Sequence, residues 1–246
     1  MKLNNSDPQS NVFVFESADD LAKAAAKRFV EYATAAIEQS GRFCVALAGG
    51  NTPRRLYEAL ASNPFRKSID WSRVQIFFGD ERCVPPDDPQ SNFRMVNESL
   101  LTKVNVPDSN VHRMKGELDP AEAASTYEAE LKSIFRESPK FDLILLGLGE
   151  DGHTASLFPG SDVLNEQSRW VIATKHPVSG QDRITLTLPL INRAAHIVFL
   201  LTGKEKAAVL REVIRNEPTA QKPASLIKPV DGSLEWLVDK DAAFCL

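Results

Sequence analysis

Cysteine is scarce in this sequence, and the few cysteines lie far apart. The 246 residues contain only Cys44, Cys83 and Cys245, and no CxxC pair occurs. An odd number of widely spaced cysteines argues against a disulfide framework and against a structural zinc site. We therefore expect a chain that needs neither disulfide bonds nor a structural zinc ion.

Long apolar runs and an excess of basic residues are also missing. No apolar run approaches the roughly 20 residues of a membrane span, and the N-terminal segment MKLNNSDPQSN has no apolar signal core. The net charge is −4 at pH 7, so no overall basic field favours nucleic acid or a membrane surface. These absences predict a cytoplasmic protein that binds neither nucleic acid nor membrane. The oligomeric state is left open, as a monomer or a small homo-oligomer.

What the chain does contain is an alternation of apolar strand patterns and amphipathic helix patterns. Strands are expected at 43–48, 74–78, 141–146 and 196–201, and helices at 17–39, 54–61 and 121–136. This alternation predicts an α/β fold, in which a mostly parallel sheet is flanked by helices on both faces in a Rossmann-like, three-layer arrangement. The runs RITLTLP and HIVFLL have no long helix between them, which predicts some mixed strands in the C-terminal half. We expect a single α/β domain over 1–246, with a loose N-terminal segment at 1–11.

The segment 141–161 is the strongest candidate for an active site. Its apolar strand pattern ends in the turn GLGEDGH, at the position past a strand where α/β proteins usually bind ligands. His153 titrates near neutral pH and suits the work of a general base, and Asp151 could fix its tautomer. The alternative is a structural histidine that is satisfied by the backbone.

A second glycine turn follows the strand pattern at 43–48. Backbone N–H groups at the start of a helix attract anions, and adjacent glycines let a phosphate approach closely. The turn therefore predicts a phosphate site, although an ordinary tight turn with a threonine N-cap is an open alternative. The residues concerned are Gly49, Gly50, Asn51 and Thr52.

Charged residues follow several other strand patterns. Asp80 and Arg82 come directly after the strand at 74–78, where Arg82 could bind a phosphate or carboxylate with two hydrogen bonds. Arg183 begins the run RITLTLP, so it reaches the same rim only if that strand is antiparallel. A surface ion-pair cluster is the alternative for Asp80 and Arg82, and solvated surface side chains are the alternative for the lysines. Three lysines complete the set, namely Lys175, Lys204 and Lys206.

The turn after residue 146 also spells the dinucleotide fingerprint G-x-G-x-x-G. Glu150 and Asp151 would repel a pyrophosphate at this position. Pro159 would end a following helix at about Phe158, which leaves little helix dipole. Lys175 stands where an acid would hold the ribose. We therefore discount a nucleotide.

Three long segments resemble one family, the 6-phosphogluconolactonases: ALAGGNTPRRLYEAL, IFFGDERCVPPDDPQSNFRMVNESLL and DLILLGLGEDGHTASLFPGS. The resemblance implies an α/β fold shared with glucosamine-6-phosphate deaminase and ribose-5-phosphate isomerase. It also implies hydrolysis of 6-phospho-D-glucono-1,5-lactone without a cofactor or metal. The family's active-site histidine matches His153 with Asp151 beside it, its GDER arginine matches Arg82, and its phosphate-region lysine matches Lys175. The loop KHPVSGQDR departs from the family because it lacks the prolines often found there.

Two other functions stay open at this stage. The related deaminases resemble the same segments, but their turn carries a glutamate five residues after the histidine, where this chain has Phe158. A sugar-phosphate sensor would normally carry a helix-turn-helix, and no such pattern precedes residue 43. We therefore expect lactone hydrolysis, with the phosphate on the amides of 49–52 and with His153 activating water.

Overall fold

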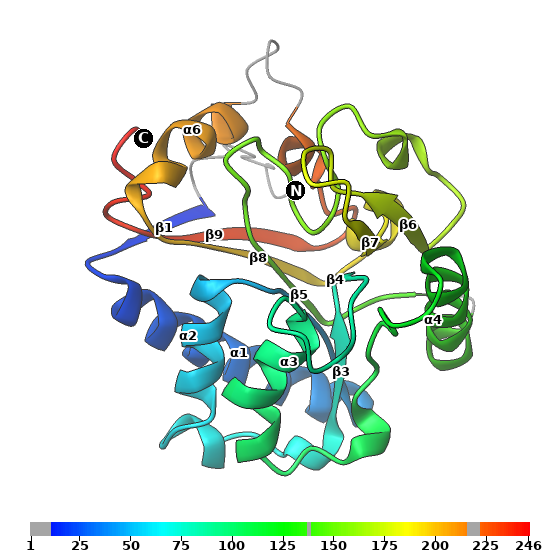
Figure 1. Cartoon of the computed structure of the whole chain (residues 1–246). Helices are drawn as coiled ribbons and strands as arrows, with labels where there is room; N and C mark the ends of the chain where they lie inside the picture. The colour runs from blue at the N-terminus through cyan, green and yellow to red at the C-terminus, as the bar shows by residue number, and fades with distance from the viewer. Residues whose placement is uncertain (1–10, 137–138, 216–221) are drawn as a thin grey trace, which may run out of the picture.

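A six-stranded parallel sheet forms the centre of the protein, as the computed structural model of residues 11–136, 139–215 and 222–246 shows (Figure 1). Its strand order is β1-β9-β8-β5-β2-β3, and every neighbouring pair is parallel. The strands of this sheet are β1 (Val12–Phe15), β2 (Phe43–Leu47), β3 (Val74–Phe78), β5 (Leu143–Leu146), β8 (His196–Leu201) and β9 (Ser233–Asp239).

A second, smaller sheet is antiparallel and has the order β4-β7-β6. Its strands are β4 (Asp80–Arg82), β6 (Val171–Lys175) and β7 (Asp182–Leu186). β4 follows β3 after one glycine, so this sheet begins where the main sheet ends. The expected antiparallel pairing is therefore present in the C-terminal half, but it lies in a sheet of its own, whereas β8 pairs in parallel on both sides.

Helices cover both faces of the main sheet, which confirms the three-layer α/β prediction. One face packs against α1 (Ala18–Ser40), α2 (Asn51–Leu60) and α3 (Asn92–Ser99). The other packs against α4 (Pro120–Phe135), α5 (Leu188–Ile191) and α6 (Ala207–Arg215). In Figure 1, α1, α2 and α3 lie below the sheet and α6 lies above it. Side chains alternate along β2, so Val45 enters one core and Ala46 the other.

Local signals in the sequence explain most of the element boundaries. Ser17 caps α1 by accepting a hydrogen bond from the Asp20 N–H at 3.2 Å, and Gly41 ends this helix with φ 79°. Helix α2 begins at Asn51, three residues earlier than expected, because Pro53 is tolerated within a first turn. Val111 forms a single isolated bridge with Ile76 at the edge of β3.

The chain after β5 confirms that the G-x-G-x-x-G spelling opens no long helix. It passes through turns into the short 3-10 helix Asp162–Asn165. Across the described ranges, none of the helices has the length and apolarity that crossing a membrane requires. Of the expected loose segment at 1–11, residues 1–10 lie outside the described residues.

Candidate active site

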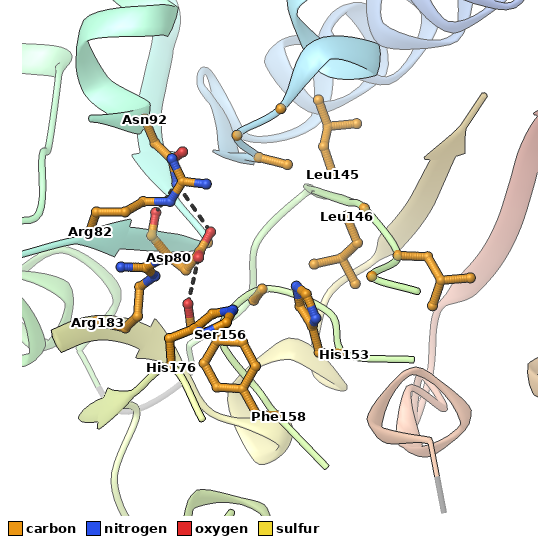
Figure 2. A pocket seen from close by; sticks show the side chains of 18 of the residues that line it. Asp80, Arg82, Asn92, Leu145, Leu146, His153, Ser156, Phe158, His176 and Arg183 are labelled. Carbon is orange, nitrogen blue, oxygen red and sulfur yellow. Dashed lines mark hydrogen bonds between the residues drawn. The ribbon is translucent and has the colours of Figure 1, made fainter. Parts of the chain in front are cut away.

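A cavity of about 310 Å³ lies at the carboxyl ends of β2, β3 and β5. Its volume is at the lower end of the range for small-molecule sites. Figure 2 shows His153 on one side of this cavity, and Arg82 and Arg183 on the other. Seven of the residues predicted from sequence line it: Gly49, Gly50, Asp80, Arg82, His153, Arg183 and Lys206.

The turn after β5 holds His153 through its own backbone hydrogen bonds. The Gly149 N–H donates to the His153 carbonyl at 2.8 Å, and the Gly152 N–H donates to the Gly149 carbonyl at 3.0 Å. The Thr154 hydroxyl donates to the Gly147 carbonyl, also at 2.8 Å. These bonds fold the segment back on itself and direct the imidazole toward the cavity.

Two glycines in this turn are required by its geometry. A Cβ atom at Gly149 would overlap the His153 imidazole, so only glycine lets the ring lie against the backbone. Gly152 has φ 88°, in the region that favours glycine, and a Cβ there would also overlap the side chain of Lys222. The glycine-rich sequence therefore serves the placement of His153.

His153 and Asp151 form a hydrogen-bonded pair. His153 Nδ1 lies 2.6 Å from Asp151 Oδ1, and the same oxygen accepts the His153 backbone N–H at 3.1 Å. Burial acts to raise the pKa of Asp151, but the His153 N–H and imidazole outweigh it and lower this pKa. An ionised Asp151 keeps the proton on Nδ1, so Nε2 is the free, basic nitrogen. The His153 side chain is 30% exposed, so water can reach it.

Asp80 connects three segments around the cavity. Its Oδ2 accepts the hydroxyl of Ser156 at 2.7 Å, and its Oδ1 accepts the side-chain amide of Asn92 at 3.2 Å, as the dashed lines of Figure 2 mark. Ser156 belongs to the segment after β5 that also holds His153, and Asn92 belongs to α3. The Asp80 carboxylate therefore fixes the turn relative to β4 and α3.

Glu81 points the other way from β4 and anchors the start of α3. This buried carboxylate accepts the backbone N–H groups of Asn92 at 2.7 Å and Phe93 at 2.8 Å. Its burial raises its pKa, against the effect of these hydrogen bonds. Asp80 and Glu81 thus have structural contacts on opposite faces of one short strand.

Arg82 and Arg183 lie close together on the two strands β4 and β7. They are directly paired in the antiparallel register. Burial lowers the pKa of Arg183, and the positive charge of Arg82 lowers it further. Arg183 reaches the cavity because β7 is antiparallel, which was the stated condition for its role. Two neighbouring guanidinium groups facing one cavity favour an anionic ligand between them.

Other predicted residues do not line the cavity. Lys175 pairs with Asp182 across the small sheet at 2.8 Å, and both side chains therefore leave the face that carries Arg183. Lys204 Nζ lies 4.4 Å from the Phe244 ring centroid. The Thr52 hydroxyl is hydrogen-bonded to that of Thr202 at 2.8 Å. Asn51 is the first residue of α2 and is also absent from the lining.

Several lining residues were not selected from the sequence. His176 faces the cavity beside the predicted Lys175. The alternation of side chains along a strand gives the signal for His176, once the orientation of β6 is known. Asn92, Ser156 and Phe158 also line the cavity. Within the described residues, no group of three or more His, Cys, Asp or Glu side chains is arranged to hold a metal ion.

Comparisons with known proteins agree on one group. The chain is 46% identical to 6-phosphogluconolactonase of Synechocystis over 215 residues, which are 85% of this chain and 87% of the relative. It is 38% identical to 6-phosphogluconolactonase of Haemophilus influenzae, over 94% of this chain and 98% of the relative. The solved structure of 6-phosphogluconolactonase from Trypanosoma brucei is 30% identical, superposes with a TM-score of 0.87, and matches 96% of this chain and 98% of its own.

The family assignment rests on a match that covers most of the sequence. Residues 16–236 match the family described as glucosamine-6-phosphate isomerases/6-phosphogluconolactonase. The matched range contains the glycine turn at 49–50, the β4 charges, the His153 turn and Arg183. A monomeric glucosamine-6-phosphate deaminase shares the fold at 21% identity and a TM-score of 0.81. The chain therefore belongs to the family of glucosamine-6-phosphate isomerases and 6-phosphogluconolactonases.

Proposed function

We propose that this protein hydrolyses 6-phospho-D-glucono-1,5-lactone to 6-phospho-D-gluconate, the second step of the oxidative pentose phosphate pathway. The observation that carries the proposal is the His153–Asp151 pair on one side of a cavity whose other side holds Arg82 and Arg183. A base at one end and an anion site at the other match a substrate with a lactone at one end and a phosphate at the other. The names of the relatives support the same reaction.

His153 acts as the general base in this mechanism. Its Nε2 accepts a proton from a water molecule while the water oxygen attacks the C1 carbonyl carbon. The imidazolium that forms is stabilised by Asp151, whose carboxylate accepts the Nδ1–H. The exposure of the His153 side chain gives the attacking water a route from solvent.

The second step returns the proton. The tetrahedral intermediate collapses, the bond between C1 and the ring oxygen breaks, and the imidazolium gives its proton to that oxygen. One water molecule is consumed and no covalent enzyme intermediate forms. Lys206 faces the same cavity and offers a donor to the developing oxyanion.

Arg82 and Arg183 bind the phosphate in this proposal. Their mutual repulsion in the empty site is relieved when a dianion lies between them. The glycine turn at 49–50 lines the cavity, so its amides can contribute as the sequence predicted. Lys175 and Lys204 are left out, because their side chains contact Asp182 and Phe244 instead.

The direct test is an assay on freshly prepared 6-phosphogluconolactone. Release of 6-phosphogluconate is followed with 6-phosphogluconate dehydrogenase and is corrected for spontaneous hydrolysis. We expect enzyme-dependent hydrolysis, and no release of ammonia from glucosamine 6-phosphate. Ammonia release without lactone hydrolysis would assign the chain to the deaminase branch instead.

Two further parts of the account stay predictions. The cytoplasmic location is tested by fractionating the source cells. The choice between a monomer and a small homo-oligomer is tested by sedimentation at several concentrations. Both are independent of the assay.

A further inference from the structure

His176 is a second histidine in the cavity, and the mechanism above gives it no task. It follows β6 directly and begins the connection to β7. Its side chain is half-buried and lines the cavity together with Arg82 and Arg183. In Figure 2 its ring lies in the middle of the site, between Arg183 and His153.

Backbone hydrogen bonds fix the tautomer of this ring. The N–H groups of Val178 and Ser179 both donate to His176 Nδ1, at 3.3 and 3.1 Å. A nitrogen that accepts hydrogen bonds carries no proton, so in the neutral ring the proton is on Nε2. Nε2–H is therefore a hydrogen-bond donor on the edge of the ring away from the connecting loop.

Neighbouring groups keep the ring neutral and in place. The Phe158 ring lies edge-on against it, with centroids 5.0 Å apart and an interplanar angle of 71°. Burial lowers the pKa of His176, and the positive charge of Arg183 adds to this effect. His153 and Arg82 act in the same direction, while the Asp151 carboxylate opposes them. The imidazole thus offers a donor without a charge of its own.

The position of the ring assigns it to the phosphate end of the site. The His176 N–H donates to the Gln181 carbonyl, which continues the β6–β7 ladder beyond the Thr174–Arg183 pair, so His176 lies on the same face of this ladder as Arg183. The charge of Arg183 lowers the pKa of His176 more than the charge of His153 does.

We propose that His176 is a phosphate-binding residue, whose Nε2–H donates to a phosphate oxygen of the substrate alongside Arg82 and Arg183. This inference rests on the proposed function and deepens it. It makes His176 a determinant of the preference for a phosphorylated lactone over an unphosphorylated one. A hydrogen bond to a charged group contributes enough to alter affinity about 10- to 100-fold.

Two variants distinguish the role of His176 Nδ1 as an acceptor from the proposed role of Nε2–H as a donor. His176→Asn places an oxygen near the position of Nδ1, so it can still accept from Val178 and Ser179, but it has no group at the position of Nε2. His176→Gln places an amide N–H near the position of Nε2. The backbone bonds of the connection, from Gly180 N–H to the His176 carbonyl and from His176 N–H to the Gln181 carbonyl, are unaffected by either change.

The measurement compares KM and kcat for 6-phosphogluconolactone and for glucono-1,5-lactone. We expect His176→Asn to raise KM for the phosphorylated lactone about 10-fold or more, with kcat little changed. His176→Gln should recover a substantial part of this loss. Activity on glucono-1,5-lactone should not respond to either variant.

Binding of 6-phosphogluconate to the same variants, measured by calorimetry, gives a readout that does not require turnover. An unchanged KM and product affinity in His176→Asn would overturn the inference, as would an equal loss for both lactones. A wild-type protein without lactonase activity would instead overturn the proposed function. The two failures are thus distinguishable.

Discussion

At the scale of single residues, the site depends on a close approach between backbone and side chain. The imidazole of His153 lies directly against the backbone of Gly149 and is bonded to Asp151 at 2.6 Å. No larger residue fits at this position without displacing the ring. The proposed base is therefore positioned by a glycine, which has no side chain that could take part in the reaction.

Substituting this glycine should impair catalysis more than folding. We expect Gly149→Ala to displace the His153 ring and to lower kcat by about 100-fold, since small misplacements of reacting groups are costly. Gly147→Ala is the matched control in the same turn, because a Cβ there has no atom within 4 Å. Steady-state kinetics check both variants. An equal kcat for the two would contradict the role given to Gly149.

The sequence predicted the residues of the base better than the cations. His153 and Asp151 are two positions apart in one turn, so their pairing is a local property that spacing can reveal. Which cation faces the cavity depends on the register of β6 and β7, where Lys175 pairs with Asp182 and leaves the inner face to Arg183. Long-range pairing of this kind is not encoded in any single segment.

At the scale of secondary-structure elements, the small sheet brings together the residues that we propose to bind the phosphate. β4 carries Arg82 and β7 carries Arg183, and β6 leads into His176. This sheet also packs against α4. Glu128 of α4 is buried and accepts the Trp170 N–H at 3.0 Å, and its carboxylate also pairs with Arg169.

Removing the negative charge of Glu128 should weaken the packing of α4 against the small sheet. Burial acts to raise the pKa of Glu128, but the Trp170 N–H, Lys132 and Arg169 outweigh it and lower the pKa. We expect Glu128→Gln to reduce the free energy of unfolding by about 1–3 kcal/mol at pH 7, as loss of hydrogen bonds to a charged group does. Urea denaturation measures the change. Glu122→Gln, on the exposed part of α4, should stay within about 0.5 kcal/mol.

The sign of the pH dependence follows from the lowered pKa. A carboxyl with a lowered pKa in the folded state contributes stability above its unfolded pKa of about 4.3, and loses it as pH falls through the folded value. The difference between the wild type and Glu128→Gln should therefore be fullest at neutral pH and shrink below about pH 4. A difference that grows on acidification would contradict the account.

Sequence patterns were sufficient to predict some secondary-structure elements but not others. The apolar runs of β2, β3 and β5 and the capped helix α1 were predicted, because each is a buried or amphipathic segment with clear end signals. The separate antiparallel sheet was not predicted. Its strand β4 has only three residues, Asp80–Arg82, and all of them are charged, so no apolar alternation identifies it.

At the scale of the whole molecule, one sheet separates two hydrophobic cores. Trp71 lies in the core formed with α1, α2 and α3, and Trp236 lies in the other, where it stacks on Phe199 at 3.9 Å. Strands such as β2 place side chains in both cores. Loss of one core would therefore remove the support of the other, and we propose that residues 1–246 form a single domain.

Unfolding of variants that keep one core tryptophan each tests this proposal. The chain has three tryptophans, so two substitutions by phenylalanine leave either Trp71 or Trp236 as the reporter. We expect coincident urea midpoints for fluorescence and far-UV circular dichroism within each variant, as for one cooperative unit. Fluorescence midpoints of the Trp71 reporter that differ from the dichroism midpoint would indicate two domains.

The central claim is that His153 activates the water that opens the lactone. The most direct measurement is kcat for 6-phosphogluconolactone in His153→Asn, which can keep a hydrogen bond to Asp151 but has no basic nitrogen. With the thermal midpoint unchanged, the account predicts a kcat about 10²–10⁴-fold below that of the wild type and a KM that is little altered. A variant that retains nearly full turnover above the spontaneous rate would contradict it.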